Sequence, residues 1–165
     1  MTTKPATKST AKSRKSTPDA VDMLIEDHEK VKKLFKEFEK LAKKDDTEGK
    51  VEVAQKICEE LTIHAQIEEE IFYPAAREAI NDDDMLNEAE VEHATAKDLI
   101  EQISGMSGDD EMYDAKVKVL SEYINHHVEE EEGEMFKKVR KSKLDLDELA
   151  VQMMERKEEL MGALA

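Results

Sequence analysis

A chain of 165 residues is long enough for one domain with its own core, and 40% charged residues, 4% aromatic residues, three Pro, five Gly and no Trp are typical of long amphipathic helices and exclude a sheet protein. The formal net charge of −16 excludes a body that holds nucleic acid or an anionic membrane by charge. The single cysteine, Cys58, excludes an internal disulfide and suits a reducing compartment, so we expect a cytoplasmic protein.

The first 17 residues differ in charge from the rest of the chain. They hold five basic residues and no acidic one, whereas the remainder carries 41 acidic against 20 basic residues, a net charge of −21. Because this segment has no apolar run, we expect residues 1–17 to form a disordered basic tail, and neither a secretory signal nor a membrane span. A solvated tail is favoured over one that touches polyanions weakly, so we expect no specific nucleic acid and no membrane as partners.

The first predicted helix starts at residues 17–19. Thr17 offers a hydroxyl cap, Pro18 occupies the first turn, and an acidic residue lies beside the positive end of the helix dipole. Apolar positions then recur at steps of three and four as far as Ala42, which predicts one amphipathic helix.

The second predicted helix begins at Thr47, which can cap it, and its apolar stripe runs from Ala54 to Ile71. Pro74 has no backbone N–H, so it should kink or end this helix shortly before residues 75–80.

Three more helices are expected. One follows the polar turn at residues 81–84 and ends at a glycine, Gly105, and the next starts at residues 108–110. The last opens with Asp145 and Glu148 as a capping box. Its apolar stripe is thinner, so it should pack across the bundle or on a partner, and no functional residue is assigned in it.

Four of the five histidines lie on the apolar stripes, and on the second and fourth helices a glutamate follows the histidine by four residues. Residues four apart on a helix share one face, so each pair can reach one inward point. We interpret the pattern as a metal centre with six ligands: His28, His64, Glu68, His93, His127 and Glu131.

The pattern occurs twice, because 65 residues separate His28 from His93 and 63 residues separate His64 from His127. A helix pair used twice predicts a site with pseudo-twofold symmetry. The expected fold class is therefore all-α: an up-down-up-down four-helix bundle over residues 18–141, with an additional C-terminal helix over 142–165 and the disordered N-terminal tail.

Burying two carboxylates and four imidazoles without compensation would cost several kcal/mol for each ion, against a total fold stability of about 5–15 kcal/mol. A metal offsets this cost, because it binds deprotonated ligands and replaces their lost hydration. A polar core without metal is the alternative. Imidazole and carboxylate without thiolate favour iron, manganese or a di-zinc substitute over a structural zinc site.

The six ligands divide between two ions. His28 and His64 would bind one ion, His93 and His127 the other, and both glutamates would bridge them. An oxo or hydroxo bridge would make each ion five-coordinate and leave one position on each for a small molecule.

His126 and His127 compete for the same role, since His126 with Glu130 also satisfies the spacing. The stripe through Leu120 and Ile124 leads to His127, whereas that of His126 is more polar. Adjacent helical residues point about 100° apart, so only one of the two can face the bundle axis. We assign His127 as the ligand and His126 to the flank of the site.

The order His, His-x-x-x-Glu, His, His-x-x-x-Glu, with phrases such as Glu-Glu-Ile-Phe-Tyr-Pro at 69–74 and His-Val-Glu-Glu-Glu at 127–131, resembles the bacterial hemerythrin-like (HHE cation-binding) domain family. The resemblance covers about residues 19–141. It implies an up-down four-helix bundle with a non-haem centre of two iron ions (Fe2+/Fe3+) that handles dioxygen or related species.

The chain departs from the oxygen-carrying hemerythrins at Lys97, where those proteins have a fifth histidine ligand. Lys97 can extend to solvent or reach the site. Two residues one turn before a ligand could fill the vacancy, Glu60 and Tyr123. A core role for Tyr123 and a hydrogen bond from an imidazole to Glu60 are favoured. The glutamates flanking the ligands are expected on solvated outer faces, which is favoured over an iron entry path: Glu69, Glu70, Glu129, Glu130 and Glu132.

Three functions compete. The first is a module that binds or reacts with dioxygen, peroxide or nitric oxide, or handles iron. The second is a redox enzyme that consumes peroxide or oxidises ferrous ion at the same centre, and the third is a helical interaction protein with a structural metal site. The missing fifth histidine weakens oxygen carriage. The expected partner is a small diatomic or peroxide ligand, and the expected state is a monomer or weak homo-oligomer.

Overall fold

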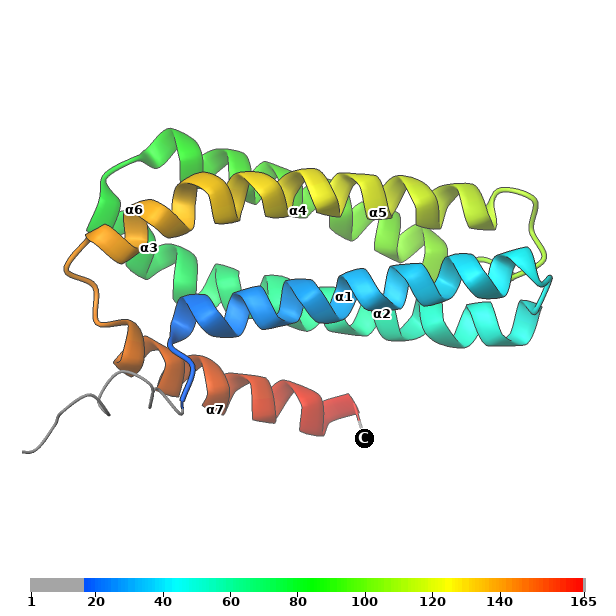
Figure 1. Ribbon diagram of the computed structural model, residues 1–165, viewed down its shortest axis with the longest axis horizontal. Helices are drawn as coiled ribbons and strands as arrows, with labels where there is room; N and C mark the ends of the chain where they lie inside the picture. Colours follow the sequence, from blue (N-terminus) through cyan, green and yellow to red (C-terminus); the bar gives the residue numbers. More distant parts are fainter. Residues whose placement is uncertain (1–16, 165) are drawn as a thin grey trace, which may run out of the picture.

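Four helical rods lie side by side and run alternately up and down, and a further helix lies outside them (Figure 1). This computed structural model describes residues 17–164, so the predicted tail lies, apart from Thr17, outside the described residues. The first rod is α1 (Ala20–Lys43) and the third is α4 (Asp83–Ser104). The expected all-α bundle is confirmed.

The second and fourth rods each consist of three consecutive helical pieces. The second contains α2 (Thr47–Ile67), a π-helical turn η2 (Glu68–Phe72) and α3 (Tyr73–Ile80). The fourth contains α5 (Tyr113–Glu130), the π-helical turn η3 (Glu131–Met135) and α6 (Phe136–Lys141). Each π turn starts at one of the two glutamates predicted as ligands.

The sequence predicted that Pro74 would kink or end the second helix. The second rod continues past Pro74, which lies in the first turn of α3 directly after η2. In η2 the N–H of Tyr73 donates to the carbonyl of Glu68, five residues earlier. The fourth rod has the same turn without a proline, and there the N–H of Phe136 donates to the carbonyl of Glu131. The π turns are therefore a shared feature of both halves and not a consequence of Pro74 alone.

Carboxylates, not hydroxyls, cap the first two helices, which corrects the predicted caps. The side chain of Asp19 accepts from the N–H of Asp22, and Asp22 returns the bond in a capping box, so α1 starts after Asp19 and not at Thr17. The carboxylate of Asp46 accepts from Gly49, which leaves Thr47 inside the first turn of α2.

The fourth rod also begins later than the predicted 108–110, at Tyr113. Residues 108–112 form turns that pack on the start of α2. A Cβ added to Gly108 would lie 2.3 Å from Cγ2 of Val51 and 3.1 Å from Cγ2 of Thr47. Gly108 therefore serves close packing of this loop on α2, and a helix start at this point would disrupt that contact.

The apolar core has two parts, one at each end of the rods. One contains Leu24, Phe72 and Leu86, and the other contains Ile57 and Leu120. The predicted ligand residues fall between these two clusters along every rod. The polar centre thus has an apolar layer at either end.

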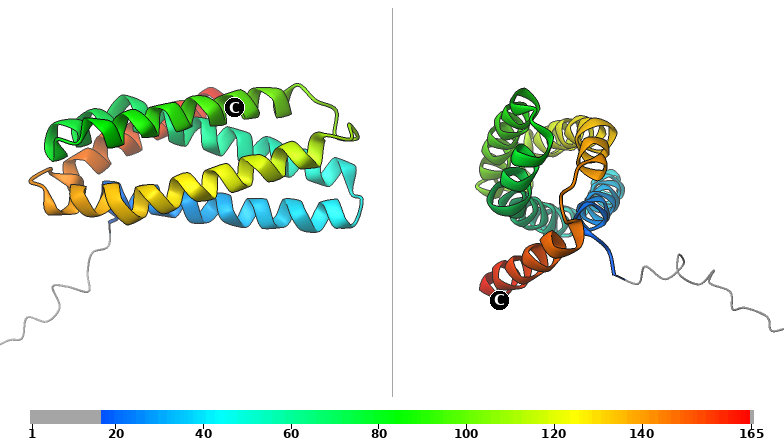
Figure 2. Two further views of the ribbon diagram at one scale, coloured as in Figure 1. Left: turned by 90° about the horizontal axis from the view of Figure 1, so that it is seen from above. Right: turned by 90° about the vertical axis from the view of Figure 1, so that its left-hand side faces the viewer.

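The C-terminal helix α7 (Leu146–Leu164) packs against α1, α2 and η2 through Leu149, Ala150 and Met153, outside the four rods (Figure 2). The carboxylate of Asp145 accepts from the N–H of Glu148, as expected for its cap. Within residues 17–164, no helix combines the length and the apolar character that crossing a membrane requires.

Candidate metal centre

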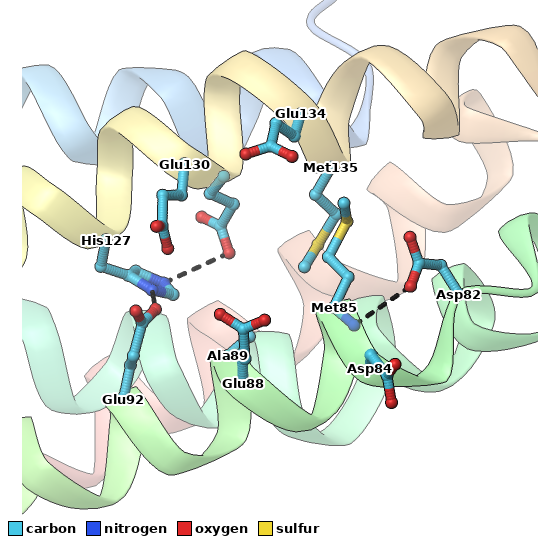
Figure 3. A pocket seen from close by; sticks show the side chains of 11 residues that line it. Asp82, Asp84, Met85, Glu88, Ala89, Glu92, His127, Glu130, Glu134 and Met135 are labelled. Atoms are coloured by element: carbon cyan, nitrogen blue, oxygen red, sulfur yellow. Dashed lines mark hydrogen bonds and ion pairs between the residues drawn. The ribbon is translucent and has the colours of Figure 1, made fainter.

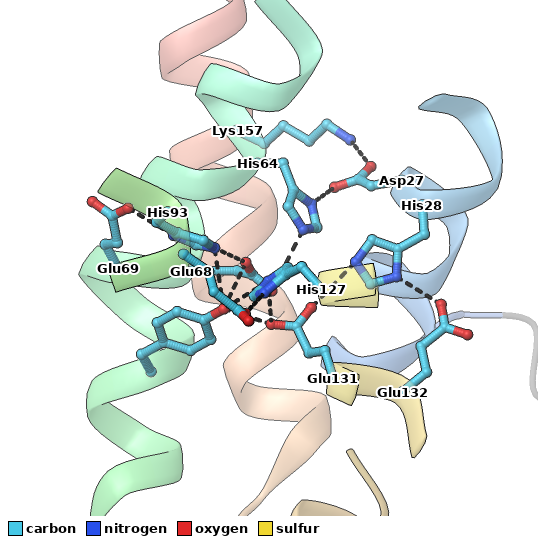
Figure 4. Close-up of polar contacts among 12 residues, drawn as sticks. Asp27, His28, His64, Glu68, Glu69, His93, His127, Glu131, Glu132 and Lys157 are labelled. Atoms are coloured by element: carbon cyan, nitrogen blue, oxygen red, sulfur yellow. Dashed lines mark hydrogen bonds and ion pairs between the residues drawn. The ribbon is translucent and has the colours of Figure 1, made fainter. Parts of the chain in front are cut away.

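The structure brings the six predicted ligand residues to one place in the interior (Figure 4). One histidine comes from each of α1, α2, α4 and α5, and the two glutamates are the first residues of η2 and η3. Both glutamates are almost fully buried, with 0% of Glu68 and 2% of Glu131 exposed, and the four histidines are 5–8% exposed. Burial of this kind requires that their charges be balanced locally.

The two glutamates each face one histidine from either half of the chain. Oε2 of Glu68 lies 3.4 Å from Nε2 of His64, and Oε1 lies 3.0 Å from Nε2 of His93. Oε1 of Glu131 lies 3.2 Å from Nε2 of His28, and Oε2 lies 3.4 Å from Nε2 of His127. Each carboxylate therefore spans two positions, in the manner of a bridging ligand.

Ligand-type atoms gather at both positions. In the first group, His28, His64, Glu68 and Glu131 each offer an atom, all within 4.8 Å of one another. In the second group, Glu68, His93 and His127 do the same. His28 and His64 thus share one position and His93 and His127 share the other, which is the division between two ions that the sequence pattern predicts.

Every imidazole also makes a hydrogen bond to a carboxylate through Nδ1. His28 Nδ1 lies 2.6 Å from Glu132 Oε2, and His93 Nδ1 lies 2.7 Å from Glu69 Oε2. The remaining two contacts join His64 to Asp27 at 2.8 Å and His127 to Glu92 at 2.5 Å. An Nδ1–H donor leaves the Nε2 lone pair free on the side of the centre, which is the tautomer that a metal needs.

Two of these acceptors correct the sequence interpretation, which placed the flanking glutamates on solvated outer faces. Glu69 and Glu132 directly follow the buried glutamates. Glu69 contacts His93 and Glu132 contacts His28, in each case the histidine of the other half that has no glutamate four residues after it. The signal in the sequence that marks them is their equivalent place in the two copies of the pattern, one residue after Glu68 and Glu131.

The test of whether these residues fit a metal is the state of their inward atoms. Within residues 17–164, four buried side-chain atoms make no hydrogen bond of acceptable geometry: Nε2 of His28, Nε2 of His64, Oε2 of Glu68 and Oε1 of Glu131. They face one another in the two charge contacts of 3.2 and 3.4 Å given above. They belong to the four residues of the first group. Unpartnered buried polar atoms are rare and costly, whereas a cation satisfies all four at once. The donor set of imidazole and carboxylate fits iron or a similar divalent ion.

Tyr73 is a residue of the centre that the sequence reasoning missed. Its hydroxyl lies 2.5 Å from Oε2 of Glu131, 3.1 Å from Oε1 of Glu68 and 3.2 Å from Nε2 of His93. Nε2 of His127 is 3.4 Å away. The hydroxyl thus contacts ligand atoms of the second group, whereas the four atoms without a hydrogen bond belong to the first group.

The π turn explains why periodicity did not reveal Tyr73. In a regular α-helix a residue five positions after Glu68 would point about 140° away from it. In η2 the hydrogen bonds join residues five apart, so Tyr73 returns to the side of Glu68. The phrase Phe-Tyr-Pro was visible in the sequence, but nothing in it predicted a π turn.

The charges of the centre shift the pKa values of its members strongly. Burial alone would lower the pKa of His127, but the carboxylates of Glu131, Glu68 and Glu92 outweigh it and raise the pKa to about 10. Burial would also raise the pKa of Glu131, yet His127 and His28 hold it well below its usual range. For Tyr73, burial and then the carboxylates of Glu131 and Glu68 raise the pKa well above normal, so its phenol stays protonated. Without a metal, the centre therefore keeps protons that a cation would displace.

The residues proposed to fill the place of a fifth histidine lie elsewhere. The carboxylate of Glu60 pairs with Lys30 at 3.0 Å. Tyr123 is half-buried, and among the described residues it makes no hydrogen bond to a residue of the centre. The ammonium of Lys97 lies 2.6 Å from Oε1 of Glu69 and thereby supports the carboxylate that His93 contacts. His126 has a side chain that is 66% exposed and pairs with Glu130 at 3.2 Å.

Comparison with known proteins agrees with the geometry. Residues 19–139 match the family described as hemerythrin HHE cation binding domain. A protein named DNA nickase from Nostoc sp. is 33% identical over 119 residues, which is 72% of this chain but 33% of that protein, so the chain spans about a third of that relative. A crystal structure of a hemerythrin HHE cation binding domain-containing protein, the Rv2633c homologue from Mycobacterium kansasii, superposes with a TM-score of 0.73 at 22% identity, covering 89% of this chain and 90% of that one. That likeness shows the fold.

Proposed function

Because this chain belongs to the family of hemerythrin HHE cation-binding domains, we propose that it holds two iron ions and that these bind or react with dioxygen, peroxide or nitric oxide. The observation that carries metal binding is the set of four unpartnered buried atoms around one point. Imidazole and carboxylate oxygen without thiolate favour iron among the metals that such a set accepts.

We assign the ligands from the contacts of the inward atoms. His28 and His64 would hold one ion and His93 and His127 the other, and the carboxylates of Glu68 and Glu131 would each give one oxygen to either ion. Tyr73 would lie beside the second ion, where its hydroxyl faces His93 and Glu131. The ions would supply redox chemistry and open positions for a small ligand.

The residues around the ligands then have definite tasks. Asp27, Glu69, Glu92 and Glu132 hold the imidazoles in the tautomer that directs Nε2 inward. The phenol of Tyr73 keeps its proton and donates it toward Oε2 of Glu131, which places a proton donor at one side of the centre. Phe72 and Leu24 belong to the apolar layer that keeps water away.

Iron content and colour test this proposal. The full chain, stripped with a chelator and reconstituted with excess ferrous ion under anaerobic conditions, should retain about two iron ions after desalting. After exposure to air it should show the near-ultraviolet absorption of an oxo- or hydroxo-bridged ferric pair, which dithionite should bleach. Retention of one ion or none would refute the dinuclear centre.

Rapid mixing distinguishes a binding module from a redox enzyme. The absorption of the reduced protein should change when it is mixed rapidly with dioxygen or peroxide. A single change without further consumption identifies a binding module, and repeated consumption of peroxide identifies a catalyst. The activity in the name of the Nostoc relative belongs to that protein, and the 41 acidic against 20 basic residues after residue 17 of this chain repel a polyanion.

A further inference from the structure

A cavity of about 200 Å3 lies between α4 and the fourth rod (Figure 3). Six acidic residues line its outer part: Asp82, Asp84, Glu88, Glu92, Glu130 and Glu134. Among the described residues, no lysine or arginine lines this cavity, although Lys138 pairs with Asp82 at 2.7 Å. A concave surface with one sign of charge concentrates ions of the opposite sign.

The inner end of this cavity reaches the proposed ligands. His127 and Glu131 also line it, although they are only 7% and 2% exposed. Glu131 is one of the residues with an unpartnered buried oxygen, Oε1. The acidic cavity therefore connects the surface with ligand residues that are otherwise enclosed by the bundle.

Two other cavities, beside α1 and α5, differ from the acidic cavity in the charge of their lining and in their contact with the proposed ligands. One contains Lys43 and Lys118, the other contains Lys32 and Lys36, and neither is lined by any of the six proposed ligands. In these two cavities lysines lie among the carboxylates, whereas the lining of the acidic cavity within residues 17–164 has seven carboxylates and no lysine or arginine. The acidic cavity is thus the favoured path for a cation.

A second cluster of ligand-type side chains lies beside the acidic cavity. Glu92, His126 and Glu130 each offer an atom, all within 4.8 Å of one another. Nε2 of His126 is 3.2 Å from Oε2 of Glu130. Glu92 belongs to both sites, because its Oε1 also accepts the hydrogen bond from Nδ1 of His127 at 2.5 Å. The outer cluster and the buried centre therefore share one carboxylate.

We propose that Glu92, His126 and Glu130 form a loading site that captures a divalent cation and passes it through the acidic cavity to the buried centre. The inference rests on the proposed function, since it concerns how the metal arrives. One imidazole and two carboxylates at the surface leave most positions of the cation to water, so binding there is weak and exchange is fast. The buried centre, with more ligands, then retains the ion.

The test compares rates of iron uptake by the metal-free full chain. The variant His126→Ala/Glu130→Gln removes two members of the cluster and leaves the six proposed ligands intact. The control Asn125→Ala/Glu129→Gln removes the same charge from the same helix, at residues that line one of the lysine-containing cavities. Each protein is mixed anaerobically with ferrous ion, quenched with a ferrous chelator after set times, desalted and assayed for retained iron.

We expect the loading-site variant to take up iron about tenfold more slowly than the wild type, with the same final content, and the control to match the wild type. Added salt should slow the wild type more than the loading-site variant. Equal rates in the two double variants would overturn the loading site. A wild type that retains no iron would instead refute the proposed function.

Glu130→Gln lies directly beside the proposed ligand Glu131 and could slow uptake by disturbing the centre, so a second variant changes only residues farther from it in the chain. Glu88→Gln/Glu134→Gln lowers the charge of the cavity wall at two exposed residues outside the cluster. It should slow uptake while the final iron content and the absorption spectrum stay unchanged. If this variant takes up iron at the wild-type rate, the acidic cavity is not the path.

Discussion

Tyr73 and Phe136 occupy equivalent positions, each five residues after a buried glutamate. The ring of Tyr73 packs on His93, and the ring of Phe136 packs on His28. The ring centroids of Tyr73 and His93 are 5.2 Å apart, and those of Phe136 and His28 are 6.0 Å apart. The pseudo-twofold centre is therefore asymmetric by one hydroxyl, present in the second group and absent from the first. This difference explains why the unpartnered atoms belong to the first group.

Tyr73→Phe should lower the stability of the metal-free protein by about 1–3 kcal/mol, because Oε2 of Glu131 loses a buried donor. Urea unfolding in the presence of a chelator measures this change. The reciprocal variant, Phe136→Tyr, brings a hydroxyl near the first group and should stabilise the metal-free protein. If neither variant changes the unfolding midpoint, the hydroxyl does not contribute to holding the centre together.

Glu68→Ala and Glu131→Ala should each reduce retained iron from about two ions to one or fewer, because each carboxylate contacts both histidine pairs. The thermal midpoint of either reconstituted variant should fall below that of the wild type, since bound metal stabilises the folded state. Glu129→Gln, an exposed residue, is the control. Full iron content and an unchanged spectrum in both alanine variants would show that neither glutamate is a bridge.

His127→Ala should abolish one iron position, whereas His126→Ala should keep the full iron content at equilibrium. The reason is burial: His127 is 7% exposed with Nε2 directed to Glu131, whereas the side chain of His126 is 66% exposed. Iron assays after desalting distinguish the two. The opposite result would mean that the ligand on α5 is His126.

The metal-free protein should lose stability as the pH rises from 6.5 to about 10. Folding raises the pKa of His127 from the usual 6.5 to about 10, so its contribution is complete below 6.5 and is lost as the pH approaches 10. Thermal unfolding in chelator at several pH values measures the slope. His127→Gln should flatten it, and so should bound metal, which replaces the proton. An equal slope in all three samples would contradict the assignment.

The sequence alone determined which face of each rod is buried and that the faces carry histidine and glutamate. Periodicity is a local property, so the steps of three and four that end at His127 and Glu131 fixed the register of α5 without any neighbour. The resemblance to the HHE family followed from the same spacing. The helix starts were less accurate, because the choice between Thr17 and Asp19, or between Thr47 and Asp46, depends on which side chain reaches a free N–H.

Only the tertiary structure decided which side chains meet across the rods. Glu69 reaches His93 and Glu132 reaches His28, each from the other half of the chain, and Lys157 on α7 lies 2.9 Å from Asp27, the acceptor of His64. Periodicity within one helix cannot rank such pairings, because it gives the direction of a side chain and not its neighbour. The π turns decided the rest, since they bring Tyr73 and Phe136 to the side of the ligands, where an α-helix would turn them away.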